Sequence, residues 1–238
     1  MKFLLIGRGK MGALIEKTAQ NAGDEIVAAL GREDLASLAQ MGKVADAVID
    51  FSGPDTLDAV EAYIRRTGTP LLSGTTGYSA QQKDRIAALG AYAPVLWSAN
   101  FSLGIAVFVR ALQTVSDVLK PDFDIEISEI HHNQKADSPS GTAKLLLEAV
   151  DPRHELTPVY GREGNCGKRD GKEIGMHALR GGTVAGEHSV FFFGTDETLE
   201  LKHTAASRRI FAAGALRAAR CVLGKGPGLY NMDDVLES

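Results

Sequence analysis

The segment from Glu129 to Lys144 concentrates residue types that move protons and hold anions. His131 and His132 are adjacent, and Lys135 follows closely along the chain. An imidazole exchanges protons near neutral pH, and an ammonium group stabilises negative charge. These three side chains favour acid-base chemistry on a small substrate that carries carboxylates.

A helix is expected directly after these residues. Four apolar residues recur at the spacing of one buried helix face, which places the start of the helix near residue 140: Ala143, Leu146, Leu147 and Val150. Ser138 or Ser140 can cap this helix, and Pro139 suits its first turn because proline lacks the N–H that would have no partner there.

The start of that helix would form an anion cradle. The N–H groups of Ser140, Gly141 and Thr142 would point outward with the positive end of the helix dipole, and Gly141 has no side chain to block a carboxylate. Most capped helices bind nothing, so the histidines and the lysine just upstream are what favour a substrate site.

A metal site is the rival interpretation of the histidine pair. Adjacent histidines point in different directions on an extended chain, and no further ligand residue stands at a suitable spacing. Cys166 and Cys221 lie far apart, so we expect neither a disulfide framework nor a zinc site. We therefore expect no metal.

Composition excludes several classes of protein. The 238 residues carry a net charge of -4, which leaves no basic surface for nucleic acid. No apolar run is long enough to span a membrane, and the apolar residues near the start are too few for a signal peptide. We expect a folded cytoplasmic protein with reduced thiols.

The N-terminus predicts a dinucleotide site. The apolar run Phe3–Ile6 is followed by Gly7-Arg-Gly-Lys-Met-Gly12, which matches GxGxxG, and then by apolar residues at helical spacing. In this pattern the first glycine permits a tight turn, the second lets the backbone approach a pyrophosphate, and the third allows close packing of helix and strand. The expected cofactor contacts are Gly7, Arg8, Gly9, Lys10, Met11 and Gly12.

The choice between NADH and NADPH stays open at this stage. An acid at the end of the second strand binds the ribose of NAD, whereas an arginine there binds the 2′-phosphate of NADP. Here Gly31 stands where the acid would be expected, and Arg32 and Glu33 follow. Arg32, helped by Lys10, favours NADP, whereas Glu33 could neutralise that arginine or bind the ribose itself.

Further strands over 47–51, 70–73 and 95–97 alternate with helical patterns, which predicts a parallel sheet. Ligands of such sheets bind beyond the carboxyl ends of the strands, where small polar turns follow here. The turns predict cofactor contacts on the nicotinamide side: Gly74, Thr75, Thr76, Ser98, Ala99, Asn100 and Phe101.

A second domain begins after this sheet. An apolar helix over 103–119 and an alternating strand over 123–127 lead into the loop of His131, and further strands are expected over 175–179, 188–194 and 198–204. The run 190–193 is apolar on both faces, so helices or another subunit should cover it. We expect an α/β protein: a Rossmann-like dinucleotide-binding domain over 1–102 with 207–238, and an α+β domain with an open mixed sheet over 103–206, which binds substrate and forms the oligomer.

Taken in order, these motifs resemble those of the dihydrodipicolinate reductase family. The most specific is His-His-x-x-Lys-x-Asp-x-Pro-Ser-Gly-Thr at 131–142, and Gly186-Glu-His188 follows it; the resemblance spans nearly the whole chain. It implies reduction of the cyclic imine formed from 4-hydroxy-tetrahydrodipicolinate to tetrahydrodipicolinate by NADH or NADPH, in lysine and diaminopimelate biosynthesis. It also implies a cytoplasmic homotetramer assembled through the sheet of the second domain.

Roles for single residues follow from the same resemblance. His131 would be the acid-base residue and Lys135 a second proton donor, while His132, Gly141 and Thr142, together with Ser140 of the cradle, would hold the substrate carboxylates. The chain departs from many members at Asn133 and Gln134, between the histidine pair and the lysine, and at Gly31. The alternatives are a related NAD(P)-dependent amino-acid dehydrogenase that acts on aspartate and a non-catalytic NAD-binding sensor. The sensor would need no proton donors beside its anion site.

Overall fold

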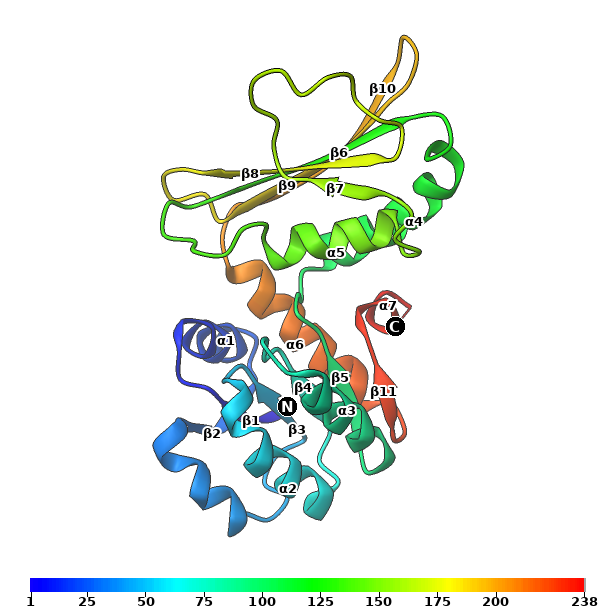
Figure 1. Cartoon of the computed structure of the whole chain (residues 1–238). Helices are drawn as coiled ribbons and strands as arrows, with labels where there is room; N and C mark the ends of the chain where they lie inside the picture. Colours follow the sequence, from blue (N-terminus) through cyan, green and yellow to red (C-terminus); the bar gives the residue numbers. More distant parts are fainter. Residues whose placement is uncertain (238) are drawn as a thin grey trace. The chain divides into compact units, whose positions relative to one another are not determined.

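The computed structural model describes residues 1–237, which divide into two compact units (Figure 1). The first comprises Met1–Leu103 together with the chain from Arg209 onward, and the second comprises Gly104–Arg208. No helix in the described part of the chain is long and apolar enough to cross a membrane.

A six-stranded parallel sheet forms the centre of the first unit. Its strand order is β11-β5-β4-β3-β1-β2, with bounds Gly228–Tyr230, Pro94–Trp97, Leu71–Ser73, Ala47–Asp50, Lys2–Ile6 and Glu25–Leu30. The chain winds outward in opposite directions from β1 and β3, so a crevice opens beyond their carboxyl ends. This arrangement confirms the expected Rossmann-like fold.

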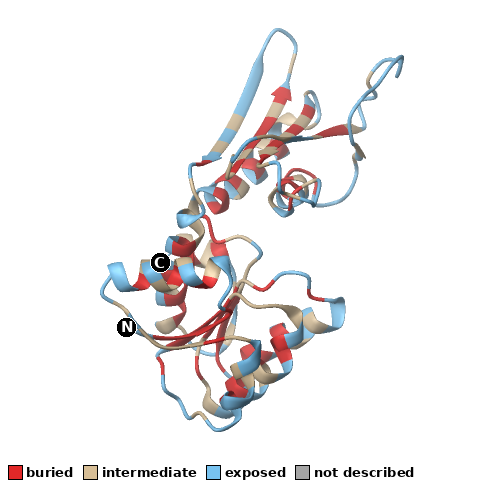
Figure 2. Ribbon diagram, turned by 90° about the vertical axis from the view of Figure 1, so that its left-hand side faces the viewer, coloured by how far each residue is buried: buried red, intermediate tan, exposed pale blue. Residues whose placement is uncertain are grey.

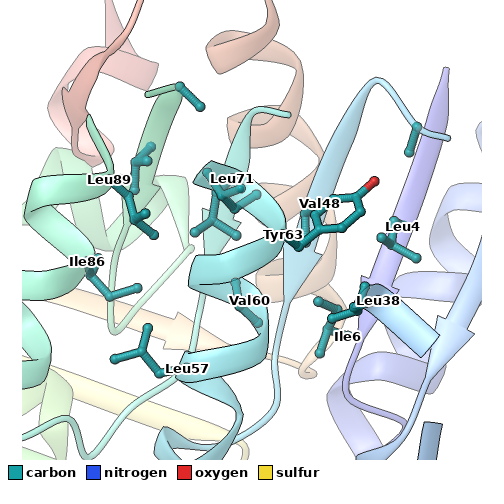
Figure 3. Packing of buried hydrophobic residues seen from close by; sticks show 14 of the residues in the cluster. Leu4, Ile6, Leu38, Val48, Leu57, Val60, Tyr63, Leu71, Ile86 and Leu89 are labelled. Carbon is teal, nitrogen blue, oxygen red and sulfur yellow. The ribbon is translucent and has the colours of Figure 1, made fainter. Parts of the chain in front are cut away.

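Helices cover both faces of this sheet. On one side, α1 (Lys10–Asn21) packs against α6 (Arg209–Leu223), which also contacts β3, β4 and β5. On the other side, α2 (Leu57–Thr67) and α3 (Ala80–Ala88) enclose a core that includes Leu4, Val48 and Tyr63 (Figure 3). Short elements complete the unit: η1 (Arg32–Ala39), η2 (Pro54–Thr56), η3 (Leu89–Ala91) and α7 (Met232–Leu236).

A five-stranded mixed sheet forms the second unit, in the order β10-β9-β6-β8-β7. The strand bounds are Thr198–Ala205, Gly186–Phe193, Asp124–His131, Glu173–Arg180 and Thr157–Val159. The central β6 runs antiparallel to β9 and parallel to β8, as expected for an open mixed sheet. Helices α4 (Leu103–Leu119) and α5 (Gly141–Val150) supply apolar side chains to the core on one face of the sheet (Figure 1).

Along β6 and β9 of the second sheet, buried residues are interspersed with half-buried or exposed ones (Figure 2). Val190 and Phe192 point into the core under the helices and are fully buried. Phe191 and Phe193 stack on the opposite face with ring centroids 5.6 Å apart, and Phe193 remains 41% exposed. The helices therefore cover only one side of the run 190–193.

The end of β6 differs from the sequence-based expectation. Alternation of apolar residues predicted a strand that stops before His131, which was placed in a loop. Instead β6 continues to His131, whose backbone carbonyl accepts from the N–H of Gly181. Glu129 and His131 keep the inward positions of the alternation, so polar residues extend a pattern that apolar residues began.

Candidate active site

The three glycines of the first turn meet different surroundings. Gly7 has a left-handed backbone (φ 104°), and a Cβ there would overlap the carbonyl oxygen of Phe51. A Cβ on Gly12 would overlap the carbonyl oxygen of Gly7. Gly9 begins the turn into α1, and no atom lies within 4 Å of the position its Cβ would take. Gly7 and Gly12 thus shape the turn, and Gly9 leaves space above it.

A cavity of about 300 Å³ opens beyond the carboxyl ends of β1, β2 and β3. This is the place where doubly wound sheets bind nucleotides. The space over Gly9 and the N-terminus of α1 suit a pyrophosphate, so the residues present fit NADH or NADPH. The cavity is lined by Ile6, Gly7, Arg8, Gly9, Leu30, Gly31, Arg32, Glu33, Leu35, Phe51, Ser52 and Thr56.

Charged side chains of both signs surround Gly31 at one end of this cavity. A Cβ on Gly31 would lie 2.6 Å from Oε1 of Glu33, so the Glu33 carboxylate occupies the space of the missing acid. Arg32 forms two bonds to Asp55, with Nε 3.0 Å from Oδ2 and Nη2 3.1 Å from Oδ1. Asp55, and not Glu33, therefore neutralises Arg32. Arg8 lies farther from its nearest acid, with Nη1 3.9 Å from Oδ2 of Asp34.

Asp50 links the ends of β3 and β4 and was not predicted from the sequence. Its buried carboxylate accepts hydrogen bonds from the hydroxyls of Ser52, Ser73 and Thr75, at 3.1 Å for Ser73 Oγ and 2.9 Å for Thr75 Oγ1. Burial raises the pKa of Asp50, although these hydrogen bonds oppose the effect. Burial, followed by the charge of Asp50, raises the pKa of Tyr78 to about 12. The sequence signal that could have identified Asp50 is an acidic residue at the end of an apolar strand.

The expected nicotinamide-side residues fall into buried and exposed groups. Thr75 is buried and turned toward Asp50, and Phe101 is buried with its ring 5.4 Å from that of Phe51. Gly74 leaves room for the Phe51 ring, which a Cβ would overlap. Thr76 and Ala99 are exposed; Ser98 and Asn100 are half-buried and bonded to each other within their turn. In the first turn, Lys10 is exposed and Met11 is half-buried.

His131 lies at the carboxyl end of β6 in the second unit and is buried. Its Nδ1 lies 2.5 Å from Oε2 of Glu129, which is fully buried on the same face of the strand. On the other side of the ring, a Cβ on Gly186 would lie 3.0 Å from Nε2. The ring of His188 stands edge-on to that of His131, with centroids 5.1 Å apart.

Glu129 gathers donors from three elements. Arg180 at the end of β8 donates Nη1 to Oε2 and Nη2 to Oε1, both at 2.8 Å, and the backbone N–H of Ser140 donates to Oε1 at 3.0 Å. Burial alone would raise the pKa of Glu129, but the hydrogen bonds from Arg180, His131 and Ser140 outweigh it and lower that pKa. Glu129 is therefore an ionised carboxylate at neutral pH.

Ser140 caps α5, which begins at Gly141, so the predicted helix start is correct and Ser140, not Ser138, is the cap. Pro139 precedes the cap, so its predicted place in the first turn is wrong. The expectation that the N–H of Ser140 would point outward to a bound anion is wrong, because the buried carboxylate of Glu129 accepts it. Ser140 Oγ accepts from the N–H of Ala143 and lies 3.1 Å from Nε2 of His188. Gly141 is exposed with open space at its Cβ position, and Thr142 follows it half-buried.

Two further polar pairs surround the expected substrate residues. Nη2 of Arg208 lies 3.1 Å from Nε2 of His132, and partial burial together with the Arg208 charge lowers the pKa of His132. Nζ of Lys135 lies 2.8 Å and 2.9 Å from the two carboxylate oxygens of Asp137. Asp137 lies within the segment 129–144 and Arg208 lies outside it. Neither residue was assigned a role from the sequence.

The predicted residues therefore form two sets, one in each unit. The turns after β1, β2, β4 and β5 carry the cofactor set, and the end of β6 with the start of α5 carries the acid-base and carboxylate set. Within residues 1–237 no cluster of three or more His, Cys, Asp or Glu side chains could hold a metal ion.

Two family models together match nearly the whole sequence. The family model described as dihydrodipicolinate reductase, N-terminus matches residues 1–101, and the one described as dihydrodipicolinate reductase, C-terminus matches residues 104–236. The 4-hydroxy-tetrahydrodipicolinate reductase of Clostridium novyi is 44% identical over 249 residues, covering 100% of this chain and 98% of that protein. The enzyme of the same name from Exiguobacterium sibiricum is 42% identical over 240 residues, covering 98% and 95%.

Solved structures show the same fold. A dipicolinate-bound dihydrodipicolinate reductase from Paenisporosarcina superposes with a TM-score of 0.76 at 20% identity, with 97% of each chain covered. An amine dehydrogenase from Mycobacterium smegmatis matches with a TM-score of 0.65 at 11% identity, covering 98% of this chain and 95% of the other. Since models of one family match both parts of the sequence and full-length relatives exceed 40% identity, the chain belongs to the dihydrodipicolinate reductases, a family of NAD(P)H-dependent oxidoreductases.

Proposed function

We propose that this chain converts 4-hydroxy-tetrahydrodipicolinate to tetrahydrodipicolinate in the route to diaminopimelate and lysine. The substrate first loses water to give a conjugated imine, which then gains a hydride and a proton. The observation that carries the proposal is the hydrogen-bonded pair of Glu129 and His131 beside the N-terminus of α5. A proton donor next to an anion cradle is what reduction of a dicarboxylate imine requires.

The acid-base residue of this proposal is His131. Bound NADH or NADPH would supply the hydride to one carbon of the conjugated imine. The electron pair then moves to a neighbouring carbon, which takes the proton from Nε2 of His131. Lys135 serves as a second proton donor, and its positive charge stabilises the charge that develops on the substrate.

The remaining residues of this set would hold the substrate's two carboxylates. The N-terminus of α5 at Gly141 and Thr142 takes one carboxylate, since Gly141 is exposed and offers open space. His132 donates to the other, together with Lys135, whose contact with Asp137 must then be exchanged for the substrate. Ser140 supports this site from behind as the helix cap.

The coenzyme would bind at the turns of the first unit. The N–H groups at Gly9 to Met11 take the pyrophosphate, and the turns at 74–76 and 98–101 line the nicotinamide side. We further propose a cytoplasmic homotetramer that covers the face of Phe191 and Phe193, because aromatic side chains on an uncovered sheet face favour association. Sedimentation equilibrium of the native chain and Phe193→Glu checks the assembly.

The activity is tested by following NADH and NADPH oxidation with freshly generated 4-hydroxy-tetrahydrodipicolinate. Oxaloacetate with ammonia, which an aspartate dehydrogenase would reduce, serves as the rival substrate. We expect oxidation only with the dicarboxylate imine. Oxidation with oxaloacetate and ammonia alone would establish the amino-acid dehydrogenase instead, and coenzyme binding without turnover on either substrate would establish the sensor.

A further inference from the structure

We propose that Glu129 is a positioning residue that holds His131 in the tautomer with hydrogen on Nδ1, so that the proton moves through Nε2. The inference rests on the proposed role of His131 in reduction. It concerns a residue that begins the segment 129–144 but was assigned no role from the sequence, and whose side chain is fully buried behind the histidine.

The tautomer follows from the donors around Glu129. An ionised carboxylate can only accept hydrogen bonds. Two bonds from Arg180 and one from the N–H of Ser140 keep Glu129 ionised in a fully buried position. Nδ1 of His131, 2.5 Å from Oε2, must therefore carry a hydrogen. The nitrogen that gains and loses the transferred proton is then Nε2.

The opposite side of the ring is arranged for this transfer. Gly186 stands beside Nε2, where even a methyl group would approach to 3.0 Å. Any larger residue at this position would cover the nitrogen that faces the substrate. Gly186 thus leaves the space beside Nε2 of His131 open, and Glu129 accepts a hydrogen bond from Nδ1 of the same ring.

The neighbouring His188 is excluded as a competing proton carrier. Ser140 Oγ accepts from the N–H of Ala143 and lies 3.1 Å from Nε2 of His188. Burial, followed by the positive charge of His131, lowers the pKa of His188 to about 4. His188 is therefore neutral near pH 7 and does not compete with His131 for the transferred proton.

Arg180 couples this pair to the substrate segment. Besides its two bonds to Glu129, Nη2 donates to the backbone carbonyl of Asp137 at 2.7 Å. Asp137 in turn pairs with Lys135. One guanidinium therefore holds the carboxylate behind His131 and the backbone of the segment that carries the second proton donor.

The test uses ¹⁵N-histidine-labelled protein, with the His131 resonances assigned from His131→Gln. In the native chain, neutral His131 should show hydrogen on Nδ1. In Glu129→Gln the tautomer with hydrogen on Nε2 should become populated, kcat should fall on the order of 100-fold, and KM should change by less than about threefold. The solvent deuterium isotope effect on kcat should rise because proton transfer becomes slower.

The double variant Glu129→Ala/Arg180→Ala guards against misfolding, because it removes both charges and leaves neither buried alone. Glu126→Gln is the matched control: Glu126 is on the same strand and pairs with Arg162, Arg169 and His177, but it faces the other side of the sheet. It should leave the His131 resonances unchanged.

Unchanged His131 resonances in both the single and the double variant would overturn the proposal. A native protein without reductase activity would refute the proposed function instead. The tautomer shift in the spectra would still decide the role of Glu129 in that case, so the two failures are distinguishable.

Discussion

Individual glycines of the nucleotide turn differ in what they do, and the difference is testable. Gly9 has open space at its Cβ position and an ordinary backbone, whereas a Cβ on Gly12 would overlap the Gly7 carbonyl. Gly9→Ala should therefore fold with nearly native stability but lose most of its NADH affinity, because the methyl group occupies the path of the pyrophosphate. Gly12→Ala should lower the free energy of unfolding by roughly 1 to 3 kcal/mol.

Urea denaturation and fluorescence titration with NADH separate the two effects. Full NADH affinity in Gly9→Ala would show that the pyrophosphate does not pass over this glycine. Native stability in Gly12→Ala would show that the turn relaxes around the added methyl group.

Removal of the His131 imidazole should affect chemistry and spare coenzyme binding. His131→Ala should lower kcat by about 10²- to 10⁴-fold, the range typical of a general acid, with an unchanged Kd for NADH, since the nucleotide cavity lies entirely in the other unit. His154→Asn is a suitable control because His154 is exposed and has a φ of 53°, which asparagine tolerates. Loss of NADH binding in His131→Ala would mean that the role is misassigned.

At the level of elements, the turn from β2 into η1 bears on coenzyme choice. The carboxylate of Glu33 lies over Gly31, and Asp55 holds Arg32, so this turn favours the ribose of NADH over a 2′-phosphate. The Arg32–Asp55 pair is exposed and is worth no more than about 1 kcal/mol. The preference for NADH should therefore be modest.

Two variants test this turn. Asp55→Asn should free Arg32 and lower the Kd for NADPH by up to about fivefold without improving NADH binding. Glu33→Gln should raise the Kd for NADH by removing the acceptor for the ribose hydroxyls. Calorimetric titration of each variant with both coenzymes gives the comparison, and equal changes for NADH and NADPH would contradict the assignment.

The main elements were predictable because their patterns are local. Apolar runs located β1, β3, β4 and β5, and helical spacing located α5. The short strands β7 and β11 were missed because, unlike β4, they are only partly buried and contain no apolar run. The predicted end of β6 came too early, because the inward positions near its end are occupied by the polar residues Glu129 and His131.

The candidate site was predictable where residue type alone carries the signal. His131, Lys135 and the glycines belong to this group. The sequence did not reveal Glu129, Arg180 or Asp50, because their partners are distant in the sequence. Arg180 donates to Glu129 from another strand, and Asp50 accepts from hydroxyls in the turns after β3 and β4. Ser140 was one of two predicted caps and is the cap. Its N–H was predicted to bind an external anion, but it donates to Glu129.

For the whole molecule, His188 couples stability to pH. Its pKa is lowered from 6.5 to about 4 in the folded chain, first by burial. A depressed histidine pKa means that only the unfolded chain takes up this proton between these values, so stability is complete above about pH 6.5 and is lost as the pH falls toward 4. Between about pH 7 and about pH 5 the loss should be about 2 kcal/mol.

Urea denaturation at the two pH values measures this loss. His188→Gln cannot take up the proton, so its stability should fall by about 2 kcal/mol less than that of the native chain over the same range. The same pH dependence in both proteins would show that His188 is not responsible.

The central claim is hydride transfer from a nicotinamide coenzyme to the dicarboxylate imine. NADH that carries deuterium on the transferring face of C4, together with freshly generated 4-hydroxy-tetrahydrodipicolinate, tests it directly by mass spectrometry of the product. The account predicts tetrahydrodipicolinate with one deuterium per molecule, formed at a rate that falls strongly in His131→Ala. Coenzyme oxidation that leaves the product without deuterium, or no product with either NADH or NADPH, would contradict it.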